Sequence, residues 1–200
     1  MRKFFVVAGF GALLALFVVV PVGVAGQPVT VPLTPPPPSF ETCKTVGTQI
    51  ICEGARVLSY GPNDSGINCG TFDPIDQGLD YQHAIRYYDT NGFLVTRVIH
   101  DHNVGAFSNP LTDASISYNQ ISNETDVLAV LGDLNSATST FTGSINFTVP
   151  GMGNVFQNAG RQVVNQATGE TLVSSGPQDF NDYFNGNTSV ADELCAALGA

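Results

Sequence analysis

The chain has 200 residues, of which 43% are hydrophobic and 12% charged, and it contains no Trp. This balance can bury a core and excludes general disorder, and the length suits one domain with a targeting sequence. The formal net charge is -10, from 17 acidic and 7 basic residues. That charge excludes the basic surface on which nucleic-acid binding depends, so no nucleic-acid partner is expected.

The first 25 residues have the three parts of a secretory signal peptide. Arg2 and Lys3 give the positive start, residues 4–20 form an apolar run, and Gly23 and Ala25 supply the small residues of a cleavage site. The run falls short of the ~20 apolar residues of a membrane span, which favours cleavage after Ala25 over a retained anchor. We therefore expect a secreted, extracellular protein that is not held by the membrane after cleavage.

Residues 26–40 are rich in proline. They contain Pro28, Pro32 and the run from Pro35 to Pro38. Consecutive prolines favour an extended polyproline II segment without a packed core. The sequence thus predicts a linker over residues 26–40, followed by one domain over residues 41–200.

Four cysteines follow the leader: Cys43, Cys52, Cys69 and Cys195. An even number in an exported chain predicts disulfides rather than metal binding or catalysis. Three pairings are possible. We favour Cys43 with Cys52, because the short segment between them can close as a hairpin, and this leaves Cys69 with Cys195.

From Thr42 onward, residues that favour strands are interrupted by Gly, Asn, Asp and Pro. Strands are predicted over residues 48–53, 81–88, 93–107, 115–121, 139–149, 154–165 and 170–174. Residues 60–80 are predicted as loop with at most one strand, and residues 123–135 are less regular. A short helix is predicted over Val190–Leu198, capped by Ser189.

Strands of about 8 to 12 residues joined by tight turns, with no alternating helices, predict a mainly β domain. We expect a single antiparallel up-and-down β-barrel, linked by disulfides and followed by the short C-terminal helix. The barrel is preferred because consecutive strands look hairpin-connected. A β-sandwich is the alternative.

Several segments resemble a group of small secreted proteins of actinobacteria that have no assigned activity. The segments are Tyr88 to Val95, Gly105 to Thr112, Val149 to Gly153, Asn158 to Arg161 and Leu194 to Leu198. They are mostly turns and strand starts, so the resemblance implies export and a compact β fold and carries over no catalytic residue. The hairpin pattern is also similar, at the level of the fold alone, to β-barrels of the allene oxide cyclase and dirigent type.

His100, Asp101 and His102 form the most suggestive polar triplet. Side chains two residues apart on a strand share a face, so both imidazoles could reach one metal ion. His83 on the preceding strand is the candidate third ligand. Asp101 and His102 are also a conceivable acid–base pair, although adjacent residues on a strand face opposite ways.

The turn between the two strands decides whether His83 can take part. A two-residue turn at Asn91-Gly92 would place His83 opposite His100. If Asp89 instead pairs with the residue after Gly92, and this glycine forms a bulge, His83 points to the other face. The Asp-x-Asn-Gly spelling favours the bulged turn, so we predict His83 on the face opposite to His100 and no metal site.

Arg86, Arg97 and Arg161 are the candidate ligand-binding residues. In a chain with so few basic groups, an arginine that points into a barrel could bind an anionic ligand or pair with a carboxylate. The alternative is an exposed arginine paired with one of the many acids. No catalytic residue is assigned, no cofactor is expected, and the oligomeric state is left open.

Two functions are compatible with these features. The first is a secreted binding or cell-surface interaction module, with a small apolar or anionic ligand as the partner. The second is an enzyme of the cyclase or isomerase kind that acts on a small apolar substrate. A cavity of about 300 Å³ or more, lined by Phe and Tyr with a convergent polar group, would support binding or catalysis, whereas a filled core would support a structural role.

We predict that the mature protein begins at or near Gly26. Edman degradation or intact-mass measurement of the exported protein checks this. Full-length chain that is retained in the membrane fraction would contradict the cleaved signal.

Overall fold

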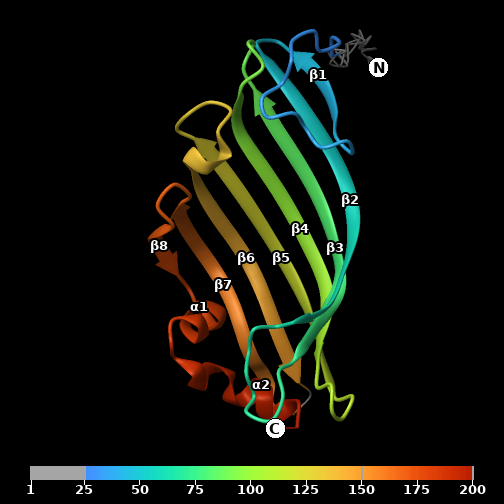
Figure 1. Ribbon diagram of the computed structural model, residues 1–200, viewed down its shortest axis with the longest axis vertical. Helices are drawn as coiled ribbons and strands as arrows, with labels where there is room; N and C mark the ends of the chain where they lie inside the picture. The colour runs from blue at the N-terminus through green and yellow to red at the C-terminus, as the bar shows by residue number, and fades with distance from the viewer. Residues whose placement is uncertain (1–25, 150, 200) are drawn as a thin grey trace, which may run out of the picture.

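The computed structural model describes residues 26–149 and 151–199, so the predicted signal peptide lies outside the described residues. Eight strands form one antiparallel sheet in sequence order (Figure 1). The strands are β1 (Thr42–Val46), β2 (Gln49–Asp64), β3 (Ile75–Tyr88), β4 (Leu94–Ser108), β5 (Ser115–Leu128), β6 (Ala137–Val149), β7 (Gly153–Asn165) and β8 (Glu170–Ser175). The mainly β, up-and-down prediction is confirmed. The strands run further than predicted, into residues 60–80 and 123–135.

The sheet is open. Within the described ranges no pairing joins β1 to β8, so these two strands are its edges. They have five and six residues, against 13 to 16 in the strands between them. Closure into the predicted barrel is therefore not seen. Nor do the described strands form the second sheet that a sandwich requires.

The turn between β3 and β4 is the predicted bulged turn. The Asp89 N–H donates to the Phe93 carbonyl at 2.9 Å, and Gly92 has a φ of 88°, in the left-handed region that glycine adopts most readily. Tyr88 accordingly lies opposite Leu94.

The predicted register beyond this turn is nevertheless wrong. Tyr87 lies opposite Thr96, so Val95 is an extra residue on β4 and forms a second bulge. Each bulge shifts the alternation of side chains by one residue, and two shifts cancel. His83 therefore lies opposite His100, on the same face of the sheet, and not opposite Ile99.

One end of the inner face is covered by the C-terminal part of the chain (Figure 1). The covering segments are α1 (Asp179–Phe184), the 3-10 helix η2 (Thr188–Ala191) and α2 (Asp192–Ala197). Tyr183 and Leu194 of these segments, with Leu198 just after α2, belong to one apolar cluster with Phe107 and Phe147. Burying such side chains contributes roughly 1.5–3 kcal/mol each, so this C-terminal cluster anchors that end of the sheet.

The C-terminal helix differs from the prediction in its start. Ser189 lies in η2, and its hydroxyl donates to the Asn187 side chain at 2.8 Å. The α-helix begins at Asp192, without a side-chain cap, and ends at Ala197. The short helix α1 was not predicted.

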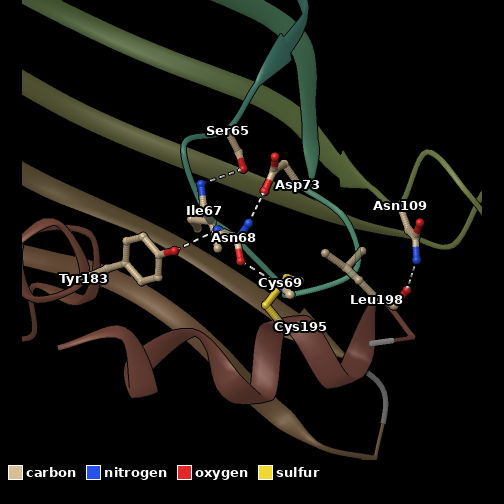
Figure 2. The surroundings of a disulfide bond; sticks show 10 residues. Ser65, Ile67, Asn68, Cys69, Asp73, Asn109, Tyr183, Cys195 and Leu198 are labelled. Carbon is tan, nitrogen blue, oxygen red and sulfur yellow. Dashed lines mark hydrogen bonds between the residues drawn. A yellow bond between two sulfur atoms is a disulfide. The ribbon is translucent and has the colours of Figure 1, made fainter. Parts of the chain in front are cut away.

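A disulfide fastens α2 to the loop that precedes β3. Cys69 in this loop bonds Cys195, and the Asn68 N–H donates to the Tyr183 hydroxyl at 2.7 Å (Figure 2). The second bridge joins Cys43 to Cys52, which lie opposite each other on β1 and β2. Both predicted pairings are confirmed.

The other end of the inner face is covered by the segment predicted as a linker. Val29, Val31 and Leu33 pack against a second cluster, which contains Ile50, Cys52, Tyr88, Leu94, Leu128 and Ala137. Thr34 donates to the Gly92 carbonyl at 2.8 Å and accepts from the Leu94 N–H at 2.9 Å. The stretch is extended, as its prolines favour, and apolar residues at every second position let it bury one side against the sheet. We call this group the N-terminal cluster.

No helix in the described part of the chain has the length and apolar character needed to cross a membrane.

We predict that the two disulfides contribute unequally to stability. The Cys69–Cys195 bridge closes a separation of 126 residues and Cys43–Cys52 one of 9. The chain-entropy account gives about 4.9 and about 2.7 kcal/mol for these loops. Urea unfolding of the two double Cys→Ala variants measures the difference. Equal losses in the free energy of unfolding would contradict the chain-entropy account, in which the longer loop restricts the unfolded chain more.

Candidate functional site: a polar cavity on the inner face

Between the two apolar clusters, the inner face of the sheet is polar. Two neighbouring rows of cross-strand partners on β3, β4 and β5 are Asp80, Asn103 and Gln120, then Gln82, Asp101 and Ser122. We call these six residues the polar belt. Inward positions of a sheet that is packed on one side are normally apolar. The polar belt therefore marks a part of the face that the core does not fill.

Part of the polar belt is held by its own hydrogen bonds. Arg56 Nε on β2 donates to Gln82 Oε1 at 2.8 Å, and Gln82 Nε2 donates to Asp101 Oδ1 at 3.1 Å. This chain fixes the side chains across three strands. It also holds the Arg56 guanidinium at the rim of the polar belt, through the hydrogen bond from its Nε.

A cavity of about 620 Å³ opens over the polar belt, next to the C-terminal cluster. Its polar lining includes Ser59, Tyr60, Ser65, Asp76, Asp80, Asn103, Tyr118, Gln120 and Asn158. Phe107 and Phe180 supply aromatic surface. A second hollow of about 320 Å³ shares Gln120 and Asn158 with the first. The cavity meets the size and lining expected of a site for a small molecule.

The second hollow exists because of a glycine pair. Gly143 on β6 and Gly160 on β7 are cross-strand partners, in the same row as Ser122. Neither glycine places a side chain over the sheet. A Cβ on Gly143 would lie 2.2 Å from the Ile121 carbonyl oxygen, so the backbone itself excludes a larger residue.

Two tyrosines meet above a second glycine pair at the cavity wall. Tyr60, Gly78, Gly105 and Tyr118 form one row across β2 to β5. The tyrosine hydroxyls are 2.5 Å apart, and the Tyr118 O–H donates to Asp76 Oδ1 at 2.8 Å. A Cβ built on Gly78 would lie 2.5 Å from the Tyr60 hydroxyl oxygen, and one built on Gly105 would lie 2.6 Å from the Tyr118 hydroxyl oxygen. Both glycines are thus required for this contact.

Three oxygen atoms of the cavity wall are buried and unpaired. Asp80 Oδ1, Asn103 Oδ1 and Asn158 Oδ1 accept no hydrogen bond from any described residue. A buried acceptor without a partner costs about 1–3 kcal/mol. Such atoms are rare in folded proteins, and all three belong to residues that line one cavity.

Burial changes the acidity of the groups around the cavity. It raises the pKa of Asp76, although the hydrogen bond from Tyr118 opposes this. It also raises the pKa of Asp80, to which the charge of Asp101 adds and which Arg56 opposes. Burial raises the pKa of Tyr60 as well, so this hydroxyl keeps its proton at neutral pH.

Two of the predicted ligand-binding arginines lie on the inner face and have carboxylate partners. Arg86 and Arg97 are cross-strand neighbours. Arg86 Nε donates to the buried Glu41 at 3.0 Å, and Arg97 donates to Asp126 at 2.6 Å and to Glu124 at 2.8 Å. The positive charge of each guanidinium is thereby balanced by carboxylates of the protein. Their role in binding a ligand stays a prediction.

Arg161 is separate from this pair. It is exposed on β7, where Thr142 of β6 and Ser175 of β8 lie opposite it. The structure therefore brings Arg86 and Arg97 together and leaves Arg161 apart. It does not combine the three arginines into one site.

The three histidines lie together on the outer face. The rings of His83 and His100 are stacked with 5.9 Å between centroids, and His83 Nε2 is 2.9 Å from Glu53 Oε1. His102 stacks on Tyr81 at 5.8 Å. Among the described residues, no three His, Cys, Asp or Glu side chains are grouped to hold a metal ion. Asp101 lies on the other face from the histidines, as the alternation along the strand predicts.

Comparison with protein families, with curated proteins and with solved structures finds no match to this chain. The resemblance to secreted actinobacterial proteins and to cyclase-type barrels stays a prediction. What the candidate site can bind must therefore be inferred from its geometry.

Sequence reasoning missed this cavity because it assigned residues 60–80 mainly to a loop. A signal was present: Asp76, Gly78, Asp80 and Gln82 recur at every second position. The residues between them include Leu79, which is 40% exposed on the outer face. The alternation of polar and apolar residues would have predicted that the apolar side of the strand faces the core and that the cavity residues face solvent.

We predict that Asp80→Asn stabilises the fold at neutral pH. A carboxyl group with a raised pKa binds its proton more tightly in the folded state, so its ionised form opposes folding above that pKa. The gain should reach up to about 0.5 kcal/mol, because solvent in the cavity screens the charge. It should shrink as the pH falls toward the ordinary Asp value near 3.9. Urea unfolding at pH 7 and pH 4 tests both statements, and a loss of stability at pH 7 would contradict them.

Proposed function

We propose that the protein is an exported binding protein that holds a small molecule in the inner-face cavity. The observation that carries this proposal is the set of unpaired buried oxygens on Asp80, Asn103 and Asn158, which line one cavity of about 620 Å³. A ligand that donates hydrogen bonds would satisfy them. The cavity volume lies within the range of small-molecule sites.

A purely structural role accounts less well for these residues. Apolar side chains at the polar belt would join the two apolar clusters into one core and would avoid the cost of desolvated polar groups. Proteins commonly retain such costs where a binding site requires them. The cavity therefore supports binding over a filled structural core.

Export is the second part of the proposal. The leader has the composition of a signal peptide, and both disulfides need an oxidising compartment to persist. The cyclase or isomerase alternative would use the same cavity and stays a prediction.

We predict that Asn103→Phe abolishes ligand binding, because the new ring would fill the cavity and remove one acceptor. Val104→Phe is the matched control: it adds a ring at the next position of β4, which is 44% exposed on the outer face. A small-molecule library screened by thermal shift should find compounds that raise the Tm of the wild type by about 5–10 °C at 100 times Kd. These shifts should persist in Val104→Phe and vanish in Asn103→Phe.

Circular dichroism confirms that both variants fold. If a compound shifts folded Asn103→Phe as much as the wild type, the cavity is not its site. If no compound shifts the wild type and native mass spectrometry finds no co-purifying molecule, the proposed function is wrong.

A further inference from the structure

At the cavity wall, the number of protons that each group carries decides which group donates in each hydrogen bond. Tyr118 has one hydroxyl proton, and it donates this proton to the Asp76 carboxylate at 2.8 Å. The contact of 2.5 Å between Tyr118 and Tyr60 must then use the Tyr60 proton. With Asp76 ionised, Tyr60 presents only lone pairs to the cavity and acts as an acceptor.

The unpaired oxygens extend this acceptor surface. Asp80 on β3, Asn103 on β4 and Asn158 on β7 carry these buried oxygens and line the same cavity as Tyr60. Three unpaired oxygens and the lone pairs of Tyr60 thus give acceptors from four strands. The amide nitrogens of the two asparagines could still donate, so the acceptors alone do not separate an amine from a neutral polyol.

The charges of the lining distinguish these two ligand classes. Asp76 and Asp80 line the larger cavity, and Asp101 and Glu124 line the adjoining hollow. Among the described residues, neither lining includes Lys, Arg or His. Arg97 compensates Glu124. Burial raises the pKa of Asp80, the charge of Asp101 adds to this rise, and Arg56 opposes it. A positive ligand beside Asp80 would offset both the burial of its carboxylate and the repulsion from Asp101.

The aromatic lining favours a cation as well. Phe107 and Phe180 line the cavity with their rings 6.4 Å apart, and aromatic faces attract ammonium groups. The carboxylates of Asp76 and Asp80 are four residues apart on β3, which is roughly 13 Å along a strand. An elongated molecule with more than one amino group could approach both.

We propose, on the basis of the binding function above, that the cavity binds an organic ammonium ion with several N–H donors, of the linear polyamine class. Its N–H groups donate to Tyr60, Asp80, Asn103 and Asn158, and its charge is balanced by Asp76 and Asp80. This ligand has the opposite sign to the anion that the arginines suggested from sequence, because the described carboxylates already engage Arg86 and Arg97.

Calorimetric titration of the mature, disulfide-intact protein tests the proposal with three probes in 150 mM salt. Spermidine carries charge and donors, tetramethylammonium carries charge without donors, and xylitol carries donors without charge. Spermidine should bind at least about tenfold more tightly than either of the others. Asp80→Asn should weaken spermidine binding by about tenfold or more.

The matched control is Asp113→Asn, which removes the same charge from an exposed turn. Asp113 has a φ of 62°, a conformation that Asn also tolerates. Spermidine affinity should not change in this variant. An equal loss in Asp113→Asn and Asp80→Asn would show binding to the acidic surface in general and would overturn the inference.

The remaining outcomes separate this inference from the proposed function. If xylitol or another neutral compound binds and Asn103→Phe abolishes that binding, the cavity is a binding site but not for a cation. If spermidine does not bind the wild type, the inference is wrong, and the library screen then decides the proposed function by itself.

Discussion

The inner face of the sheet is longer than the segments that cover it, and this mismatch governs the rest of the structure. Strands β2 to β7 have 13 to 16 residues, which corresponds to roughly 45–55 Å. The proline-rich segment covers one end, and the short helices with the loop before β3 cover the other (Figure 1). The middle has no covering element of its own, so side chains there must tolerate water or bind something else.

The two ends and the middle are held by different forces. Each end combines an apolar cluster with a disulfide. The Cys69–Cys195 bridge ties the covering helix α2 to the loop before β3, whereas Cys43–Cys52 joins β1 to β2 beneath the proline-rich segment, which packing and backbone hydrogen bonds hold. The middle depends on hydrogen bonds and ion pairs, such as Arg97 with Asp126 and Gln82 with Asp101. Hydrogen bonds contribute a modest net free energy, and unpaired ones are costly. The ends therefore provide the stability that permits an unfilled middle.

Sequence reasoning predicted what depends on local chemistry. The strands, the Asp89–Gly92 turn and both disulfides follow from neighbouring residues and from hairpin closure. The packing of Val29, Val31 and Leu33 against the sheet could not be predicted, because it depends on a partner surface far along the chain.

The candidate site shows the same limit. The meeting of Tyr60 and Tyr118 depends on Gly78 and Gly105, which lie on two intervening strands. No local pattern connects these four residues. Only the register of the assembled sheet places them in one row, and a register is hard to infer when a bulge such as that at Val95 has no glycine to mark it.

The Val95 bulge has a consequence for how the protein can vary. Because Val95 has no partner on β3, deleting it would remove the bulge and leave every cross-strand pair beyond it unchanged. Losing one paired residue next to it would instead turn the remainder of β4 over, since side chains alternate with period two. His100 and His102 would then enter the cavity, and Asp101 and Asn103 would turn out to solvent. Val95 is therefore the position in this hairpin where a single residue can be lost without changing which side chains face the cavity.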